Sequence, residues 1–402
     1  MPGFELFGKE EQKEVQDVLD NGVLMRYGFD ANRNGHYKAL QLEKDLASKM
    51  EVAHAQTVSS GTAALSVALA AAGVGAGDEV IMPTFTFVAS FESILAVGAV
   101  PVLCDIDDTL TLDPKAVKEL ISEKTKVIMP VHMCGSMADL KPLRELCDTH
   151  NLILLEDACQ AIGGSYANKP LGSYGDLGCF SFDYVKTVTC GEGGALITNS
   201  KEYADNADKY QDHGHDHIGN NRGAESHPFL GYNYRISELN AAVGVAQLRK
   251  LDATIALQKR NYTIFRDALS ALPEVTFRRV PETGVESYAF LSFFLPNEDL
   301  ARKGHAALGE HGVDACFYWY DNNWHYYKKW EHLLEQKSLS KFSKEIQDGL
   351  RKNERSFPDS DQWMGRTISC LIKVGWSEEE VQQRATAMVE AIQSVLKTST
   401  IS

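Results

Sequence analysis

The chain has 402 residues, of which 44% are hydrophobic and 24% are charged. This balance is typical of a globular protein that is long enough for one large domain and a smaller one. A formal net charge of −15 argues against a nucleic-acid partner or an anionic membrane surface, because both need a basic face.

The first residues, MPGFELFGKEEQKE, contain no basic segment followed by an apolar run, so we expect no signal peptide. No later apolar run is long enough to cross a bilayer, and none of the eight cysteines belongs to a C-x-x-C pair. These features predict a cytoplasmic protein with reduced thiols and no membrane partner.

Short apolar runs rich in β-branched residues predict strands that are buried on both faces. They occur at 79–83, 101–106, 126–132, 152–157, 178–182 and 195–199. Helical sequence separates several of these runs, at 61–72, 115–122 and 140–150. Asp113 and Pro114 supply an N-cap and a first-turn proline for the second helix. Strands that alternate with helices predict a mostly parallel sheet.

The alternation stops near residue 240. The stretch 237–269 predicts one long helix that links two domains. The sequence after it contains strand-like segments at 288–295 and 313–320 and helical segments at 301–310 and 378–396. We therefore expect a large domain over residues 1–250 and a smaller C-terminal α+β domain over 251–402.

The motif SSGTAAL at 59–65 places small and hydroxyl residues directly before a helix. The free amides at a helix N-terminus, together with the helix dipole, favour a bound phosphate. The same residues also suit an ordinary capped helix, so the motif alone leaves both readings open.

Two later motifs carry an acid and a lysine. Asp157 closes an apolar strand, where the carboxyl ends of a parallel sheet face a ligand crevice. A carboxylate there could keep a pyridine nitrogen protonated, or could simply cap the next turn. Lys186 lies just past an apolar strand and is followed by a glycine-rich turn, whereas most lysines lie on a solvated face.

These segments resemble the DegT/DnrJ/EryC1/StrS family of sugar aminotransferases, from Phe4 to about Leu396. The matching segments are SSGTAAL at 59–65, GDEVIMPTFTFVAS at 77–90, PVHMCG at 130–135, EDACQAIGGSY at 156–166, FSFDYVKTVTCGEGG at 180–194, HG at 213–214 and GYNYRISELNAAVGVAQL at 231–248. The resemblance implies a type I fold of pyridoxal 5′-phosphate (PLP) enzymes: a large α/β domain with a mostly parallel seven-stranded sheet flanked by helices, plus a smaller C-terminal α+β domain.

The resemblance also implies a role for each matching residue. Lys186 is expected to carry PLP as a Schiff base and then to move a proton, and Asp157 to pair with the pyridine nitrogen. A related branch of dehydratases has histidine in place of this lysine, so Lys186 favours transamination. The other expected cofactor contacts are Phe87 on the ring face, Gln160 at the ring hydroxyl, Gly61, Thr62 and Ser181 at the phosphate, and Asn233 at the phosphate of a neighbouring subunit. Asn233 thus implies a homodimer with active sites at its interface.

Four segments resemble one branch of the family more closely. They are GVLMRYGFD at 22–30, DHGHDHIG at 212–219, FYWYDNNWHYY at 317–327 and RTISCLIKVGW at 366–376. That branch implies transfer of the amino group of L-glutamate to the C8 aldehyde of an eight-carbon sugar acid used in lipopolysaccharide synthesis. Two alternatives remain: an aminotransferase for a nucleotide-linked ketosugar, and a non-catalytic binding protein on the same fold. The presence of Asp157, Gln160, Ser181 and Lys186 together speaks against the non-catalytic binding protein.

A sugar acid needs a cation in its pocket, and Arg26, Arg235 and His325 are the candidates. Each could equally be a surface or structural residue. Trp319 and Trp324 are candidate walls of the site, although core packing is the commoner role of such aromatics. The histidines at 213, 215 and 217 suggest a metal at first sight, but the family resemblance explains their loop, so we expect no metal.

Overall fold

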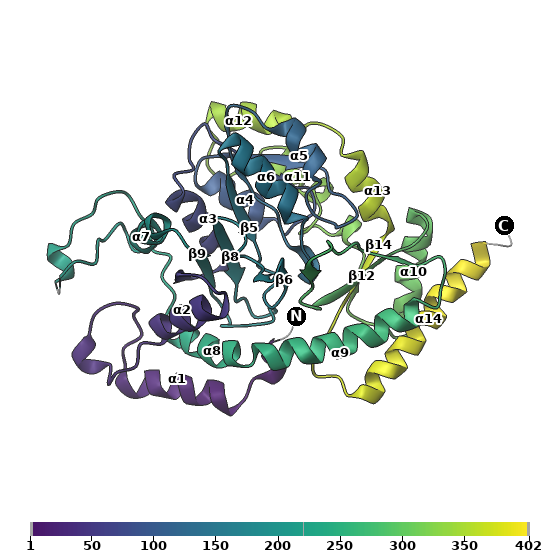
Figure 1. Cartoon of the computed structure of the whole chain (residues 1–402), viewed down its shortest axis with the longest axis horizontal. Helices are drawn as coiled ribbons and strands as arrows, with labels where there is room; N and C mark the ends of the chain where they lie inside the picture. The colour runs from purple at the N-terminus through teal and green to yellow at the C-terminus, as the bar shows by residue number, and fades with distance from the viewer. Residues whose placement is uncertain (1–2, 220, 400–402) are drawn as a thin grey trace.

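A seven-stranded sheet forms the centre of the large part of the molecule in the computed structural model, which describes residues 3–219 and 221–399 (Figure 1). The strand order is β1-β9-β8-β5-β4-β2-β3, and only β9 runs antiparallel to its neighbours. The strands are β1 (His54–Val58), β2 (Glu79–Pro83), β3 (Val100–Cys104), β4 (Thr125–Ile128), β5 (Ile153–Asp157), β8 (Leu177–Ser181) and β9 (Gly194–Thr198). The expected mostly parallel seven-stranded sheet is confirmed; β1 lies outside the six runs identified in the sequence.

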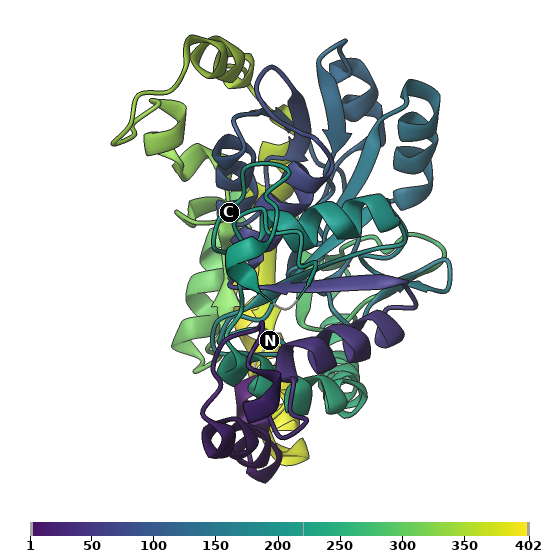
Figure 2. The ribbon, with the colours of Figure 1, turned by 90° about the vertical axis from the view of Figure 1, so that its left-hand side faces the viewer.

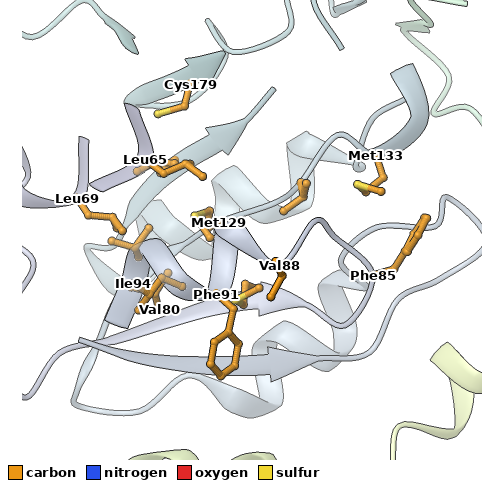
Figure 3. Packing of buried hydrophobic residues seen from close by; sticks show 14 of the residues in the cluster. Leu65, Leu69, Val80, Phe85, Val88, Phe91, Ile94, Met129, Met133 and Cys179 are labelled. Carbon is orange, nitrogen blue, oxygen red and sulfur yellow. The ribbon is translucent and has the colours of Figure 1, made fainter. Parts of the chain in front are cut away.

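Helices flank this sheet. They are α1 (Lys9–Asn21), α2 (Lys38–Lys49), α3 (Gly61–Ala71), α4 (Ala89–Ala96), α5 (Pro114–Leu120), α6 (Leu140–His150) and α7 (Lys201–Tyr210). The carboxylate of Asp113 accepts from the Lys115 N–H at the start of α5, as the sequence predicted. Figure 3 shows Leu65 and Leu69 of α3 and Phe91 and Ile94 of α4 in one cluster with Val80 of β2 and with Met129, which directly follows β4.

The predicted single helix over 237–269 is wrong in one respect, because it is two helices. The helix α8 (Glu238–Arg249) and the helix α9 (Leu251–Leu269) meet at Lys250. The Lys250 N–H bonds to the Gln247 carbonyl, a tighter turn than an α-helix makes, while its ammonium is drawn to the buried carboxylate of Glu11. The helix α9 then runs from the large sheet to the small one (Figure 1).

A four-stranded antiparallel sheet of order β10-β12-β14-β13 forms the small part of the molecule. Its strands are β10 (Thr276–Phe277), β12 (Phe290–Phe294), β13 (Cys316–Phe317) and β14 (Thr367–Leu371), and a separate three-stranded sheet joins β6 (Ser165–Tyr166), β7 (Lys169–Pro170) and β11 (Gly284–Val285). Helices α9, α10 (Glu298–Glu310) and α14 (Glu378–Ser399) pack around the core of the four-stranded sheet.

The strand predicted over 313–320 is shorter than expected. It ends at Phe317 because Trp319, Tyr326 and Trp330 pack into the core of the large sheet and draw the chain away. The helices α11 (Glu331–Leu334), α12 (Lys344–Leu350) and α13 (Pro358–Arg366) follow, and Figure 2 shows 331–350 at the opposite end of the molecule from α1. Since this segment shares the large core, the domain division at residue 250 stays a prediction.

The strands β1, β5 and β8 run in the same direction, so their carboxyl ends meet at one edge of the sheet. Ser60, Asp157 and Ser181 therefore emerge side by side, where ligands of α/β proteins bind. Among the helices of the described residues, none combines the length and apolarity that a bilayer crossing requires.

Candidate active site

A cavity of about 740 Å³ opens at this edge of the large sheet, against the small sheet. Nine of the residues singled out from the sequence line it: Gly61, Thr62, Phe87, Asp157, Gln160, Ser181, Lys186, Trp319 and His325. They come from segments far apart in the chain, and the fold brings them to one place.

The N-terminus of α3 faces this cavity. Ser60 caps the helix by accepting a hydrogen bond of 3.0 Å from the Ala63 N–H. A Cβ at Gly61 would stand 2.7 Å from the Cβ of Ser181 and 3.2 Å from the sulfur of Cys159, so only glycine allows this close approach. The amides of the first helical turn and the Ser181 hydroxyl are therefore well placed to bind an anionic group such as a phosphate.

Asp157 ends β5 with a carboxylate that is only 3% exposed. The Ser90 hydroxyl donates to it at 2.7 Å, and the Cys159 N–H donates at 3.2 Å. Ser90 itself lies 2.7 Å from the Thr86 hydroxyl. Sequence reasoning missed Ser90 as a site residue, although it closes the matching segment PTFTFVAS and comes three residues after Phe87. These bonds fix the position of the Asp157 carboxylate at the cavity wall, where a carboxylate suits a cationic ring nitrogen.

Gln160 is fixed by a turn of unusual backbone. Its side-chain oxygen accepts a hydrogen bond of 3.1 Å from the N–H of Cys134, a residue with φ of 57°. Arg278 donates to the Met133 carbonyl, and the Ser287 N–H donates to the Gly135 carbonyl, so residues from beyond 270 hold this turn. Because its oxygen is already used, Gln160 has its amide N–H groups left for a ligand.

Lys186 reaches the cavity from the loop after β8. Its N–H donates to the Asp183 carbonyl, and its own carbonyl accepts from the Gly3 N–H. Within the described residues, its ammonium makes no hydrogen bond or ion pair. An amine held by its backbone and left without a partner can react with a carbonyl group of a ligand.

Aromatic side chains form the wall beside Phe87. The ring of Phe87 stacks on Trp324 at 6.0 Å and tilts against His325 at 5.4 Å. Two backbone bonds hold the two segments together, from Thr86 N–H to the His325 carbonyl and from Val88 N–H to the Trp324 carbonyl. Trp324 is mostly exposed and does not line the cavity, whereas Trp319 is buried and does.

His325 lies in the cavity but not as a cation. Burial and the nearby charge of Lys186 lower the pKa of its ring to about 3, so the expectation of a positive charge at this position is corrected. Its Nδ1 lies 2.8 Å from the side-chain oxygen of Asn322, an oxygen that also accepts from the Trp324 N–H. The proton therefore belongs on Nδ1, and Nε2 is an acceptor.

The structure does not bring Arg26, Arg235 or Asn233 to the cavity of their own chain. Arg26 pairs with Glu43 at 2.5 Å, and Arg235 pairs with Asp212. Asn233 is exposed and accepts only a long bond of 3.4 Å from the Arg235 N–H. The two guanidinium groups are thus already neutralised by carboxylates of this chain.

Ion pairs hold the loop that carries His213, His215 and His217. His217 lies between Asp208 and Asp212, at 2.7 and 3.0 Å, and these carboxylates raise its pKa to about 9 against the effect of burial. Asp212 also accepts from Arg222 and Arg235. Over residues 3–219 and 221–399, no cluster of His, Cys, Asp and Glu has the arrangement of a metal site.

Other residues of the cavity wall were not predicted from the sequence. Phe4 stacks on Tyr184 at 4.5 Å, and the carboxylate of Glu5 accepts from the N–H groups of Val374 and Gly375. Phe290 of β12, Leu371 of β14 and Lys373 complete this side. No local pattern marks them, because contacts between distant segments place them there.

These features fit PLP. The α3 N-terminus, packed so closely that a Cβ would not fit at Gly61, suits the phosphate. The buried Asp157 carboxylate suits the pyridine nitrogen, and the unpaired amine of Lys186 suits the aldehyde.

Comparison with known proteins gives the same picture. The model of the DegT/DnrJ/EryC1/StrS aminotransferase family matches residues 6–389. GDP-perosamine synthase of Vibrio cholerae is 36% identical over 329 residues, which cover 81% of this chain and 86% of that protein. L-glutamine:2-deoxy-scyllo-inosose aminotransferase of Streptomyces lividus is 38% identical over 302 residues, 73% of this chain and 70% of that protein. The crystal structure of an aminotransferase from Psychrobacter cryohalolentis superposes with a TM-score of 0.84 at 26% identity, covering 97% of this chain and 98% of that one.

Proposed function

This chain belongs to the DegT/DnrJ/EryC1/StrS aminotransferase family, and on that premise we propose a specific reaction for it. It is a PLP-dependent sugar aminotransferase. The amino group of L-glutamate passes to the C8 aldehyde of 3,8-dideoxy-8-oxo-manno-octulosonate. The product, 8-amino-3,8-dideoxy-manno-octulosonate, serves lipopolysaccharide assembly.

Lys186 is the acid and base of this reaction. PLP, when bound, supplies an electron sink that stabilises negative charge on the substrate carbon. The Lys186 amine, held by its backbone and without a charged partner, takes the proton from the donor carbon and later returns one to C8 of the sugar. The Lys186 amine suffices for both half-reactions, because the proton transfer at the substrate carbon in the second is the reverse of that in the first.

The other residues hold the ring and exclude water. Asp157, supported by Ser90, would pair with the ring nitrogen and keep it protonated. Gln160 would donate to the ring hydroxyl, while Gly61, Thr62 and Ser181 would bind the phosphate. Phe87 covers one face of the ring, and the buried Trp319 helps to close the cavity to water.

The observation that supports the sugar acid is the position of the segment 317–327. The sequence of this segment resembles the octulosonate branch, and Phe317, Trp319, Asn322 and His325 all line the cavity. The branch-specific sequence is therefore next to the reacting amine rather than on a remote surface. The segment RTISCLIKVGW likewise contributes Leu371 and Lys373.

A nucleotide-linked ketosugar is the second candidate substrate. The name of GDP-perosamine synthase, 36% identical to this chain, favours it. A nucleotide sugar needs space for a diphosphate and a base, whereas the octulosonate needs a cation for its carboxylate.

We extend the proposal to a homodimer. Asn233 is exposed and lies outside the cavity of its own chain, in a position available to the phosphate of a partner's site. A variant Asn233→Ala would then weaken PLP binding without changing the fold of the chain.

A two-step experiment tests the reaction. Adding L-glutamate to the PLP enzyme should convert the bound cofactor to pyridoxamine phosphate, which a spectrum in visible light records. Restoration of the PLP spectrum by the C8-aldehyde octulosonate supports the proposal. Restoration only by a nucleotide-linked ketosugar transfers the assignment to the second candidate, and no response to any amino donor contradicts both.

A further inference from the structure

A second lysine, Lys373, faces the cavity from the small sheet. It follows two residues after Leu371, the last residue of β14. Leu371 and Lys373 both line the cavity. Cys370, before Leu371, and Ile372, between the two, pack into the core of the small sheet. This alternation is that of extended chain, and it starts the Lys373 side chain on the cavity side, while its ammonium lies at Asp314 and 5.5 Å from the centre of the Trp376 ring.

The backbone around Lys373 is held firmly. The Lys373 carbonyl accepts a hydrogen bond of 2.8 Å from the side-chain amide of Asn261 on α9. The next two N–H groups, of Val374 and Gly375, donate to the Glu5 carboxylate at 2.9 and 2.7 Å. A side chain on a backbone anchored at three points is suited to read a ligand.

The ammonium of Lys373 can exchange its present partner. It lies 3.2 Å from a carboxylate oxygen of Asp314, a largely exposed residue. Arg384 binds the other oxygen of the same carboxylate. Exposed pairs of this kind contribute little, so Lys373 can turn to an anion in the cavity while Arg384 continues to neutralise Asp314.

Few charged side chains of the cavity wall could bind an anionic substrate. The acidic residues of this wall are Glu5, Asp157, Asp183 and Glu192, and in the described part of the chain its lysines are Lys186 and Lys373. His325 is neutral, and Lys186 carries out the chemistry. An anionic substrate would be repelled by this wall unless the remaining cation met its charge.

We propose that Lys373 binds the carboxylate of the sugar acid and thereby selects it over neutral sugars. This inference rests on the proposed function and names the residue that reads its substrate. The carboxylate carbon and C8 are the two ends of the octulosonate chain. Lys186, in the loop after β8, and Lys373, just after β14, line the same cavity, so in this proposal the first would act at C8 and the second would bind the carboxylate.

The test compares Lys373→Gln, Lys373→Arg and the control Lys329→Gln, which removes an exposed lysine near Asp321 outside the cavity. Each is assayed with the C8-aldehyde octulosonate, with its methyl ester, and in the half-reaction with L-glutamate. Loss of a charge-assisted contact predicts a KM for the acid that is about 10- to 100-fold higher in Lys373→Gln, with kcat little changed. The arginine variant should recover most of the affinity, and the methyl ester should not distinguish Lys373→Gln from the wild type.

Other outcomes overturn the inference in distinguishable ways. An unchanged KM, or an equal loss for the acid and the ester, removes Lys373 from carboxylate binding while the proposed function stands. A loss confined to the L-glutamate half-reaction assigns the lysine to the donor instead. A wild-type enzyme that does not accept the octulosonate at all contradicts the proposed function, and this inference with it. Unchanged melting temperatures of the variants show that folding is not the cause.

Discussion

The hydroxyl of Ser90 donates a hydrogen bond of 2.7 Å to the carboxylate of Asp157, and both residues are almost completely buried. This contact joins the first turn of α4 to the end of β5. It connects the segment that carries Phe87 to the acid that is expected to hold the cofactor nitrogen, so its loss should alter the cofactor without removing any residue that touches substrate.

Ser90→Ala should reduce kcat/KM about 10- to 150-fold. A hydrogen bond to a charged group contributes about 1.5–3 kcal/mol, and about 1.4 kcal/mol corresponds to tenfold in rate. Steady-state kinetics and the spectrum of bound PLP measure the effect. Ser93→Ala is the matched control, because Ser93 is buried in the same helix and donates to the Ser90 carbonyl instead. Equal activity of the two variants would contradict a role of Ser90 at the acid.

Lys186→Ala should abolish turnover, since no other amine of the cavity wall is expected to replace it in chemistry. PLP should then be absent or bound without a covalent link. Borohydride treatment followed by mass spectrometry of peptides measures this directly, with a label on Lys186 in the wild type only. The exposed Lys201→Ala serves as control. Full activity of Lys186→Ala would rule out the mechanism.

Gly61→Ala should weaken PLP binding about tenfold or more, because the new Cβ would stand 2.7 Å from the Cβ of Ser181 and push α3 away from the phosphate. Titration of the apoenzyme with PLP measures the affinity. Gly309→Ala in α10 is a control with nothing within 4 Å of the new methyl group, and it should be neutral or slightly stabilising. Unchanged PLP affinity in Gly61→Ala would place the phosphate elsewhere.

The ion pairs of His217 should make the loop after α7 sensitive to alkaline pH. The folded-state pKa of His217 is raised from 6.5 to about 9, so the stabilisation is fully present below pH 6.5, declines as the pH rises, and is lost above about pH 9. His217→Asn should therefore increase hydrogen exchange in residues 213–219 at pH 6 and have little effect at pH 10. His36→Asn, at an exposed pair, should change nothing in this loop. An equal effect at both values of pH would show that the charge of His217 does not hold the loop.

Sequence reasoning located the main residues of the cavity correctly because strand direction is a local property. Gly61, Asp157, Ser181 and Lys186 each follow or end one of three strands of the same sheet, β1, β5 and β8, and all three run in one direction. The alternation of strands and helices predicts this arrangement, and with it the common edge of the sheet. The roles given to these residues rest further on the family.

The candidate cations show what local sequence does not determine. Arg26 and Arg235 are neutralised by Glu43 and Asp212, partners that no local pattern identifies. His325 is kept neutral by burial and by Lys186, a residue in a distant part of the chain. The charge that a side chain offers to a ligand depends on its neighbours in space.

The class of fold, the family and the order of the cofactor motifs could be predicted from the chain alone, because periodicity, helix caps and strand-end residues occupy short stretches of sequence. The folded chain was needed to show which side chains share the cavity, that Ser90 supports Asp157, and that α8 and α9 divide at Lys250. It was also needed to show that Lys373, beside the small sheet, lines the same cavity as Lys186. These features arise from contacts between segments far apart in the chain, and such contacts form only when the two sheets and the segment 317–327 pack together.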